Sequence, residues 1–354
     1  MGGVPGGLSP PLVSLEHEEL VIRRGRRSGA YTVVAVHSTA RGPALGGCRM
    51  WRYQSSADGA RDALKLSRAM TFKAAAADLR LGGGKGVICA DPGRAPSGRR
   101  RRDMLLDFAD TVNALDGSYV TAEDVGTSAR DMAVIAQGTS HVRGLSRSKG
   151  GSGDPSPFTA IGVEAAIRAC CERAFGSPEL RGRSIALIGV GRVGSSLAKR
   201  LARAGAKLLI ADIDESKRAL VAKLPGARWT DPTSALLADT DVVAPCALGG
   251  AVDGVTAGRL RCRVLCGAAN NQLTHDGLAE DLRAHGILYG PDFIANAGGL
   301  INIAVEIEGY DPARARRRVA QVGDTMREIL ERADTDRVTP LEAAFALART
   351  RLGG

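Results

Sequence analysis

Residues 184–205 read SIALIGVGRVGSSLAKRLARAG, and they decide the fold of the second half of this 354-residue chain. An apolar run typical of a buried strand leads directly into a G-x-G-x-x-G turn, and a helical pattern follows it. The first glycine of such a turn permits a sharp bend, the second lets backbone approach a pyrophosphate, and the third lets the helix pack on the strand. The sequence therefore predicts a dinucleotide site in the order strand, turn, helix. The motif consists of Gly189, Val190, Gly191, Arg192, Val193 and Gly194.

The next predicted strand, residues 208–212, ends in Asp212, roughly twenty residues after the glycine motif. A carboxylate at this place accepts hydrogen bonds from ribose hydroxyls and repels the extra phosphate of NADP. NAD is therefore the predicted cofactor. The alternative interpretation is a glycine-rich turn beside an ordinary surface aspartate.

The segment 143–157 is rich in Gly, Ser and Pro and indicates a linker. Before it, the pattern predicts a mixed α+β region, with strands at 20–24, 31–37 and 85–90 and helices at 57–77 and 103–115. After it, strands alternate with helices, which predicts a parallel sheet covered on both faces. We expect an α/β chain of two domains, residues 1–150 and 151–334, with a C-terminal helix at 335–354 packing back on the first.

Composition restricts the class of protein. No apolar stretch is long enough for a membrane span, and the N-terminus lacks a secretory pattern, which favours a cytoplasmic protein. The seven cysteines have no paired spacing, so neither a disulfide framework nor a metal site is indicated. The net charge of +10 suggests nucleic acid, but arginine is spread along the chain. Its one dense run, 99–102, lacks interleaved aromatic residues and is interpreted as solvated surface.

Four unusual stretches lie in the first half: LGGCRM at 45–50, MTFK at 70–73, GGGK at 82–85 and TAEDVGT at 121–127. They offer two lysines on short irregular segments and an acid in a strand-to-loop turn. Taken alone, such lysines and acids are more often surface charges than catalytic groups.

Together with GSGDPSPFTA, APCALGG, GAANNQL and PDFIANAGGLIN further along, these stretches resemble the amino-acid dehydrogenase family of leucine, valine, phenylalanine and glutamate enzymes. The resemblance implies an α+β substrate and oligomerisation domain, a Rossmann-type doubly wound NAD domain, and an active site in the cleft between them. It also implies a homo-oligomer that acts on a small molecule, while the spread of charge and the lack of a long apolar stretch argue against a nucleic-acid or membrane partner. The implied reaction is reversible, NAD-dependent oxidative deamination of an L-amino acid to the 2-oxo acid and ammonia.

The resemblance assigns a role to each matching residue. Lys85 matches the catalytic lysine, which activates water as a base, and Asp124 matches the acid that holds the substrate amino group and moves its proton. Lys73 matches the lysine that pairs with the substrate carboxylate, helped by the backbone of Gly46 and Gly47. Asn270 matches an asparagine that contacts both substrate and nicotinamide, and a further cofactor contact is implied at Ala247.

The side-chain pocket that we infer is apolar. Glutamate enzymes of the family carry a lysine where this chain has Leu45, and burying an unpaired carboxylate there would cost roughly 3 kcal/mol or more. Ala122 favours the leucine and valine enzymes, whereas Leu300 and the C-terminal tail favour phenylalanine enzymes. A leucine or valine type is preferred. Two alternative functions are a catalytically silent NAD-binding sensor and a 2-hydroxy-acid dehydrogenase. The inferred pocket comprises Leu45, Met70, Ala122, Leu300 and Ile303.

Overall fold

The computed structural model describes residues 16–91, 93, 95–247 and 249–353, which form two compact units. The first unit holds the described residues of Met1–Thr71 and Leu81–Val142. The second holds Phe72–Arg80 and the described residues of Arg143–Gly354. The division falls inside helix α1 (Ser56–Ala76), so the two halves of this helix belong to different units.

The main part of the second unit begins at Arg143, eight residues before the boundary expected from the linker composition. The reason is a set of hydrogen bonds that tie the linker backbone to one carboxylate. Gly144 N donates to Glu306 Oε2 at 3.0 Å, and Ser152 N donates to the same oxygen at 2.8 Å. A Gly- and Ser-rich composition shows that a segment is irregular, but it does not show what holds the segment.

Residues 335–354 were expected to pack back on the first domain, and the structure groups them with the second unit. Their helix, α14 (Pro340–Leu352), contacts the end of α1. Arg351 Nη1 donates to the carbonyl of Ala76 at 2.6 Å, and the Phe345 ring meets Phe72 edge-on at 5.6 Å. The last residues of α1 lie in the second unit with α14.

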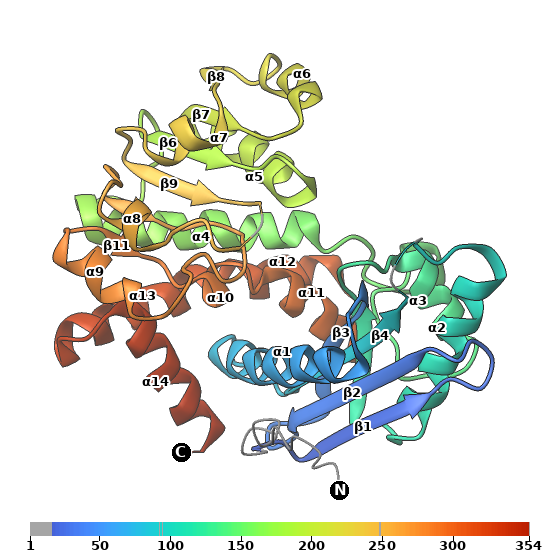
Figure 1. Cartoon of the computed structure of the whole chain (residues 1–354). Coiled ribbons are helices and arrows are strands. Elements are labelled where there is room, and N and C mark those ends of the chain that lie inside the picture. The colour runs from blue at the N-terminus through green and yellow to red at the C-terminus, as the bar shows by residue number, and fades with distance from the viewer. Residues whose placement is uncertain (1–15, 92, 94, 248, 354) are drawn as a thin grey trace, which may run out of the picture. The chain divides into compact units, whose positions relative to one another are not determined.

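The first unit is built on a five-stranded sheet in the order β1-β2-β4-β3-β5 (Figure 1). β2 runs antiparallel to both β1 and β4, whereas β3 runs parallel to β4 and β5. The prediction of strands at 20–24, 31–37 and 85–90 agrees with β1, β2 and β4. The strands are β1 (Glu19–Arg24), β2 (Tyr31–Ser38), β3 (Ala44–Arg52), β4 (Gly82–Ala90) and β5 (Tyr119–Glu123).

Helices cover both faces of this sheet, which explains why five successive residues of β2 are buried. On one face, Val33 and Ala35 pack against Ala60 and Leu64 of α1. On the other face, Thr32 shares a 2.8 Å hydrogen bond with a threonine of α2 (Gly98–Asn113). The short helix α3 (Ala129–Ile135) lies beside α2 (Figure 1).

The second unit contains a six-stranded, fully parallel sheet in the order β11-β10-β9-β6-β7-β8. The chain builds outward from β6 in one direction through β7 and β8, then returns to build through β9 in the other. This reversal of strand order between β6 and β9 is where doubly wound sheets bind dinucleotides. The strands are β6 (Ser184–Ile188), β7 (Lys207–Ala211), β8 (Ala227–Trp229), β9 (Val242–Pro245), β10 (Val264–Leu265) and β11 (Leu288–Tyr289).

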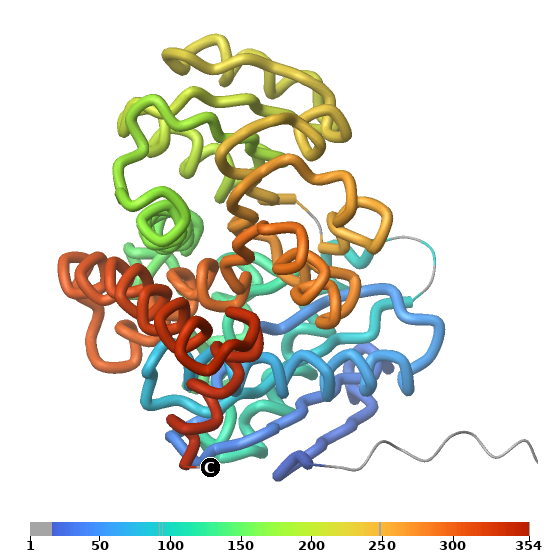
Figure 2. Tube along the Cα trace, turned by 90° about the vertical axis from the view of Figure 1, so that its left-hand side faces the viewer, coloured from blue at the N-terminus to red at the C-terminus, as the bar shows by residue number. Residues whose placement is uncertain are grey.

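Helices surround this sheet. The long helix α4 lies beside α13, far from it in sequence (Figures 1 and 2). Gln321 separates two successive helices of this unit, α12 and α13. The helices are α4 (Ser156–Phe175), α5 (Arg192–Arg203), α6 (Arg218–Val221), α7 (Pro232–Leu236), α8 (Gly254–Ala257), α9 (Leu278–Ala284), α10 (Asp292–Ala295), α11 (Gly298–Ile307), α12 (Pro312–Ala320) and α13 (Val322–Asp336); 3-10 turns occupy Arg147–Lys149 and Glu215–Lys217.

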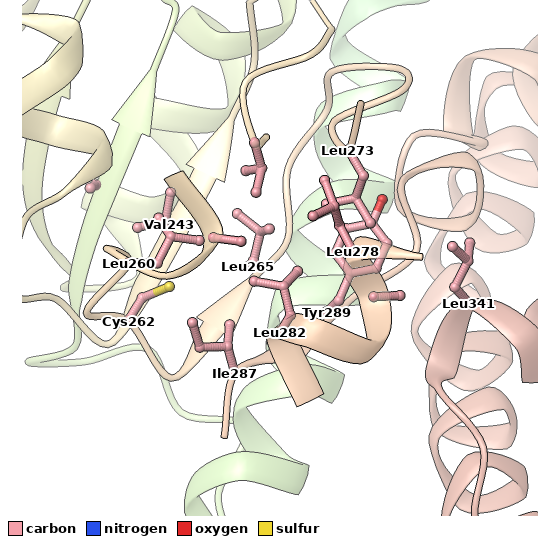
Figure 3. Close-up of a cluster of buried hydrophobic side chains, with 14 residues drawn as sticks. Val243, Leu260, Cys262, Leu265, Leu273, Leu278, Leu282, Ile287, Tyr289 and Leu341 are labelled. Atoms are coloured by element: carbon pink, nitrogen blue, oxygen red, sulfur yellow. The ribbon is translucent and has the colours of Figure 1, made fainter. Parts of the chain in front are cut away.

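A buried apolar cluster supports the β9–β10–β11 side of the sheet (Figure 3). Val243 and Leu265 contribute from the strands, Leu282 from α9, and Leu341 from the start of α14. Within the described part of the chain, every helix is too short or too polar to cross a membrane.

Candidate active site

Strand β3 carries the LGGCRM stretch between β4 and β5 of the first sheet. Lys73 and Lys85, which were expected on short irregular segments, lie in α1 and β4. Because side chains alternate along a strand, Leu45 and Gly47 share one face. Ala122 of β5 pairs with Gly47 in register and therefore lies on that face, and Asp124 follows two residues later. On the other side of β3, Leu45 pairs with Gly83 of β4. Two residues further along β4 comes Lys85, so strand register gathers three separate motifs on one face.

Lys85 and Asp124 form an ion pair on this face, with 2.6 Å between Nζ and Oδ2. The Lys85 side chain is only 6% exposed and that of Asp124 is 24% exposed, so water screens the pair weakly. Burial by itself would raise the pKa of Asp124. Lys85, Arg49 and the backbone N–H of Val125 together outweigh burial and hold that pKa below its usual value. Asp124 is thus an anion paired with a buried lysine.

Arg49 is a member of the site to which the sequence assigned no role. Its Nε lies 3.2 Å from Asp124 Oδ2, and its Nη1 lies 2.9 Å from Oδ2 of Asp62 on α1. Tyr53 also donates to that Asp62 oxygen. Arg49 stands inside the LGGCRM stretch, so the available signal was its place in a motif already noted. Its partners, 13 and 75 residues away in sequence, are set by the tertiary fold.

The turn after β5 is held by side-chain hydrogen bonds. Thr127 Oγ1 accepts from Asp124 N at 2.9 Å and lies 2.8 Å from the carbonyl of Cys48, to which it donates. Arg101 Nη2 donates to the carbonyl of Gly126 at 2.7 Å, and its guanidinium pairs with Asp131. The interpretation of residues 99–102 as solvated surface is therefore wrong for Arg101, while its three neighbours are exposed.

Glycine is needed at two positions of β3 for steric reasons. A Cβ on Gly47 would lie 2.7 Å from Cβ of Asp124. A Cβ on Gly46 would lie 1.7 Å from the carbonyl oxygen of Gly84, and the carbonyl of Gly46 itself accepts a 2.6 Å hydrogen bond from Tyr119. These glycines allow β3, β4 and β5 to approach closely around the ion pair.

Other residues that the sequence proposed for the substrate are divided between the units. Met70 lies half-buried on the part of α1 that belongs to the first unit. Lys73 follows in the last turn of α1 and belongs to the second unit, as do Leu300 and Ile303, each 8% exposed on α11. Burial raises the pKa of Asp292, and Lys73 acts in the opposite direction on that carboxyl.

The glycine motif has the expected geometry. Gly189 has φ +98°, and a Cβ there would lie 2.7 Å from the Cβ of Ala247. A Cβ on Gly194, in the first turn of α5, would lie 1.9 Å from the carbonyl of Gly189. At Gly191, by contrast, a Cβ would meet nothing within 4 Å, so this glycine borders open space at the helix N-terminus. Such a cradle suits a pyrophosphate.

Asp212 follows the end of β7 and lies against the same turn. Its Oδ2 accepts a 2.6 Å hydrogen bond from Val190 N, and its Oδ1 accepts from Asp214 N. Arg192 opens α5 and is exposed, while Val193 is half-buried. Together, the glycine cradle and the carboxylate one strand away fit a dinucleotide whose ribose carries free hydroxyls.

Comparison with known proteins identifies this arrangement. Residues 18–141 match the family model described as Glu/Leu/Phe/Val dehydrogenase, dimerisation domain, and residues 208–352 match that of Glutamate/Leucine/Phenylalanine/Valine dehydrogenase. The chain belongs to this family. Residues 164–248 also match the NAD binding domain of D-isomer specific 2-hydroxyacid dehydrogenases. The resemblance, the two-domain α/β fold and NAD as cofactor are thereby confirmed, and the chain is an NAD-dependent amino-acid dehydrogenase.

Relatives match over nearly the whole chain. A valine dehydrogenase of Streptomyces virginiae is 43% identical over 95% of this chain and 94% of its own length. A leucine dehydrogenase of Bacillus subtilis is 40% identical over 95% of this chain and 92% of its own. The solved L-tryptophan dehydrogenase of Nostoc punctiforme is 36% identical, covers 96% of both chains and has a TM-score of 0.83.

Proposed function

We propose that the chain deaminates a branched-chain L-amino acid, of the leucine or valine type, to its 2-oxo acid and ammonia, and catalyses the reverse reaction. The observation that carries this proposal is the buried Lys85–Asp124 pair on a face that also presents Leu45 and Ala122. The pair supplies proton-transfer groups, and the two apolar side chains favour an uncharged substrate side chain. Relatives named leucine and valine dehydrogenase support this substrate class.

Each polar group has a role that fits its setting. Lys85 Nζ acts as the base toward the attacking water, and Asp124 Oδ2, 2.6 Å away, receives and returns protons. Ionised Asp124 also attracts the substrate ammonium. Lys73 and the backbone of Gly46 and Gly47 bind the substrate carboxylate, because a cation and N–H donors match its two oxygens.

The cofactor residues follow from the glycine cradle. Gly189, Gly191 and Gly194 give the pyrophosphate access to the N-terminus of α5, and the carboxylate of Asp212 accepts from the ribose. Ala247 lies against Gly189, and Asn270 is exposed in the loop after β10. Bound NAD supplies the hydride acceptor for the substrate α-carbon.

An aromatic amino acid is the second candidate substrate. The Nostoc punctiforme protein named L-tryptophan dehydrogenase is 36% identical over almost the full length. Leu300 and the C-terminal tail favour phenylalanine enzymes, as noted from the sequence. Because one methylene changes binding by only about 1–3 kcal/mol, the two substrate classes differ by the fine shape of the pocket.

We further propose a homo-oligomer that assembles through the first unit. The family model matching residues 18–141 is described as a dimerisation domain. The solved glutamate dehydrogenase of Thermus thermophilus, described as hetero-hexameric, has the same fold at 24% identity. A cytoplasmic location stays a prediction from the sequence.

The deciding experiment is NADH formation at alkaline pH with leucine, valine, isoleucine, phenylalanine, tryptophan, glutamate and alanine, each with NAD and with NADP. We expect rapid turnover of leucine or valine with NAD and none of glutamate. Preference for an aromatic substrate would replace the branched-chain assignment. No turnover with any of them, in protein that binds NADH, would favour the silent sensor.

A further inference from the structure

Two asparagines of the second unit form a hydrogen-bonded pair: Asn270 lies in the loop after β10, and Asn296 lies directly after α10. Asn296 is 5% exposed, whereas Asn270 is exposed. Asn296 Nδ2 donates to Asn270 Oδ1 at 2.8 Å and to the carbonyl of Ala268 at 3.1 Å. The sequence singled out Asn270 but gave Asn296 no role.

The backbone carbonyl decides which way both side-chain amides face. Ala268 O can only accept, so the Asn296 atom next to it must be the NH2 group. Turning the Asn296 amide over would place two acceptor oxygens at about the 3.1 Å that now separates Nδ2 from Ala268 O. It would also move the NH2 group into the position of Oδ1, which is buried without a partner among the described residues. A buried donor without an acceptor is costlier than an under-used carbonyl oxygen.

The orientation passes from Asn296 to Asn270. Because Asn296 presents N–H to it, Asn270 must turn Oδ1 toward Asn296 and its NH2 group away. The exposed end of Asn270 is therefore a hydrogen-bond donor. A donor binds carboxylate, carboxamide or hydroxyl oxygen and does not bind an ammonium group.

We propose that Asn296 is a positioning residue that locks Asn270 as a hydrogen-bond donor to an oxygen of the bound ligand. This oxygen belongs to the substrate carboxylate or to the nicotinamide half of the cofactor. Asn270 therefore does not bind the substrate ammonium group. The inference rests on the proposed function, because it takes Asn270 as a ligand-binding residue.

The first test is Asn270→Asp, which places a carboxylate oxygen where the NH2 group faces outward. Repulsion of the ligand oxygen should lower kcat/KM by about tenfold to a hundredfold, the effect of losing one hydrogen bond to a charged or polar group. The same loss should appear in NADH affinity, followed by fluorescence, if the oxygen belongs to the cofactor. If Asn270 instead accepted from the substrate ammonium, N270D would retain or improve amino-acid binding. That result would overturn the proposal. Asn271→Asp adds the same charge at an exposed neighbour and should change either quantity by less than about threefold.

The second test is a double-mutant cycle with Asn296→Asp and Asn270→Ala. N296D accepts but does not donate, so Asn270 turns its NH2 group inward and the outward donor is lost. We expect kcat/KM to fall about tenfold or more in the wild-type background and not to fall further in N270A. An equal loss in both backgrounds would mean that Asn296 acts independently of Asn270, and the proposal would be wrong.

Two further variants separate positioning from folding. Asn302→Asp introduces the same change at another buried asparagine, whose Oδ1 already accepts from Tyr310, so the fall in its unfolding temperature measures the folding cost of a buried carboxylate alone. Asn296→Ser replaces N296D in the cycle if thermal unfolding shows that N296D does not fold, because serine has one donor in place of two. Wild-type turnover is measured first, so failure of the proposed function is seen before any variant is compared. If N270A keeps wild-type kcat/KM and NADH affinity, Asn270 does not bind the ligand and this inference is wrong, while the assignment as an enzyme stands.

Discussion

Nζ of Lys85 lies 2.6 Å from Oδ2 of Asp124, although the two residues are 39 positions apart in sequence. Arg49 Nε contacts the same oxygen at 3.2 Å, so one carboxylate oxygen is shared by two cations. This arrangement favours the ionised form of Asp124 in a largely buried place and sets an ion pair on one face of a sheet.

Lys85→Ala should reduce turnover by about a hundredfold to ten-thousandfold, because it removes the proposed base. NADH affinity should be unchanged, since the glycine cradle belongs to the other unit. Steady-state kinetics and NADH fluorescence measure the two quantities. Lys65→Ala, at an exposed position of α1, is the matched control and should keep full activity. Normal turnover in K85A would remove Lys85 from the mechanism.

Arg49→Met should move the acidic limb of the pH–kcat profile to higher pH. The positive charge of Arg49 lowers the pKa of Asp124, so its removal raises that pKa, and ionised Asp124 is lost earlier as the pH falls. A pH series of kcat measures the shift. Arg61→Met, on the exposed side of α1, should leave the limb in place. An unmoved limb in R49M would show that Asp124 does not depend on Arg49.

Gly47→Ala should destabilise the fold by about 1–3 kcal/mol and lower kcat as well, because the new Cβ would lie 2.7 Å from Cβ of Asp124. Denaturant unfolding and steady-state assays measure both effects. Gly254→Ala is the control, since a Cβ there meets nothing within 4 Å and φ is not in the left-handed region. Wild-type kcat in G47A would mean that β3 shifts to accommodate the new Cβ without displacing Asp124.

Asp212→Asn should raise the NADP-to-NAD ratio of kcat/KM by about tenfold or more, because the charge that repels the extra phosphate is gone. The asparagine oxygen can still accept the hydrogen bond from Val190 N, which preserves the turn. Asp214→Asn removes a charge two residues away and should leave the ratio unaltered. If D212N still rejects NADP, another group must set the cofactor preference.

Local patterns were enough to predict the nucleotide-binding region. The run from Ser184 through the glycines into α5, followed by Asp212 at the end of the next strand, has the order expected from sequence. Each step depends on neighbours within one strand–turn–helix unit, so short-range conformational preferences and alternation of apolar residues suffice. Lys85 and Asp124 were found through family motifs rather than from local pattern.

Other features depended on contacts between distant segments. LGGCRM is a central strand in spite of two glycines, because β4 and β5 approach too closely for side chains at Gly46 and Gly47. Arg49 pairs with Asp124, and Arg101 donates a hydrogen bond to the turn that follows Asp124. Both contacts form only when β3, β5 and α2 are brought together by folding.

The amino-acid sequence alone determined the class of fold and the glycine turn, and it supplied the proposal for the reactive side chains, since these features lie in contiguous motifs. Only the tertiary structure decided which charges pair and which way an amide faces. The Asn296 side chain is oriented by the carbonyl of Ala268, 28 residues away, and it in turn orients Asn270. Such choices depend on hydrogen-bond partners brought together by folding, and no periodicity in the chain encodes them.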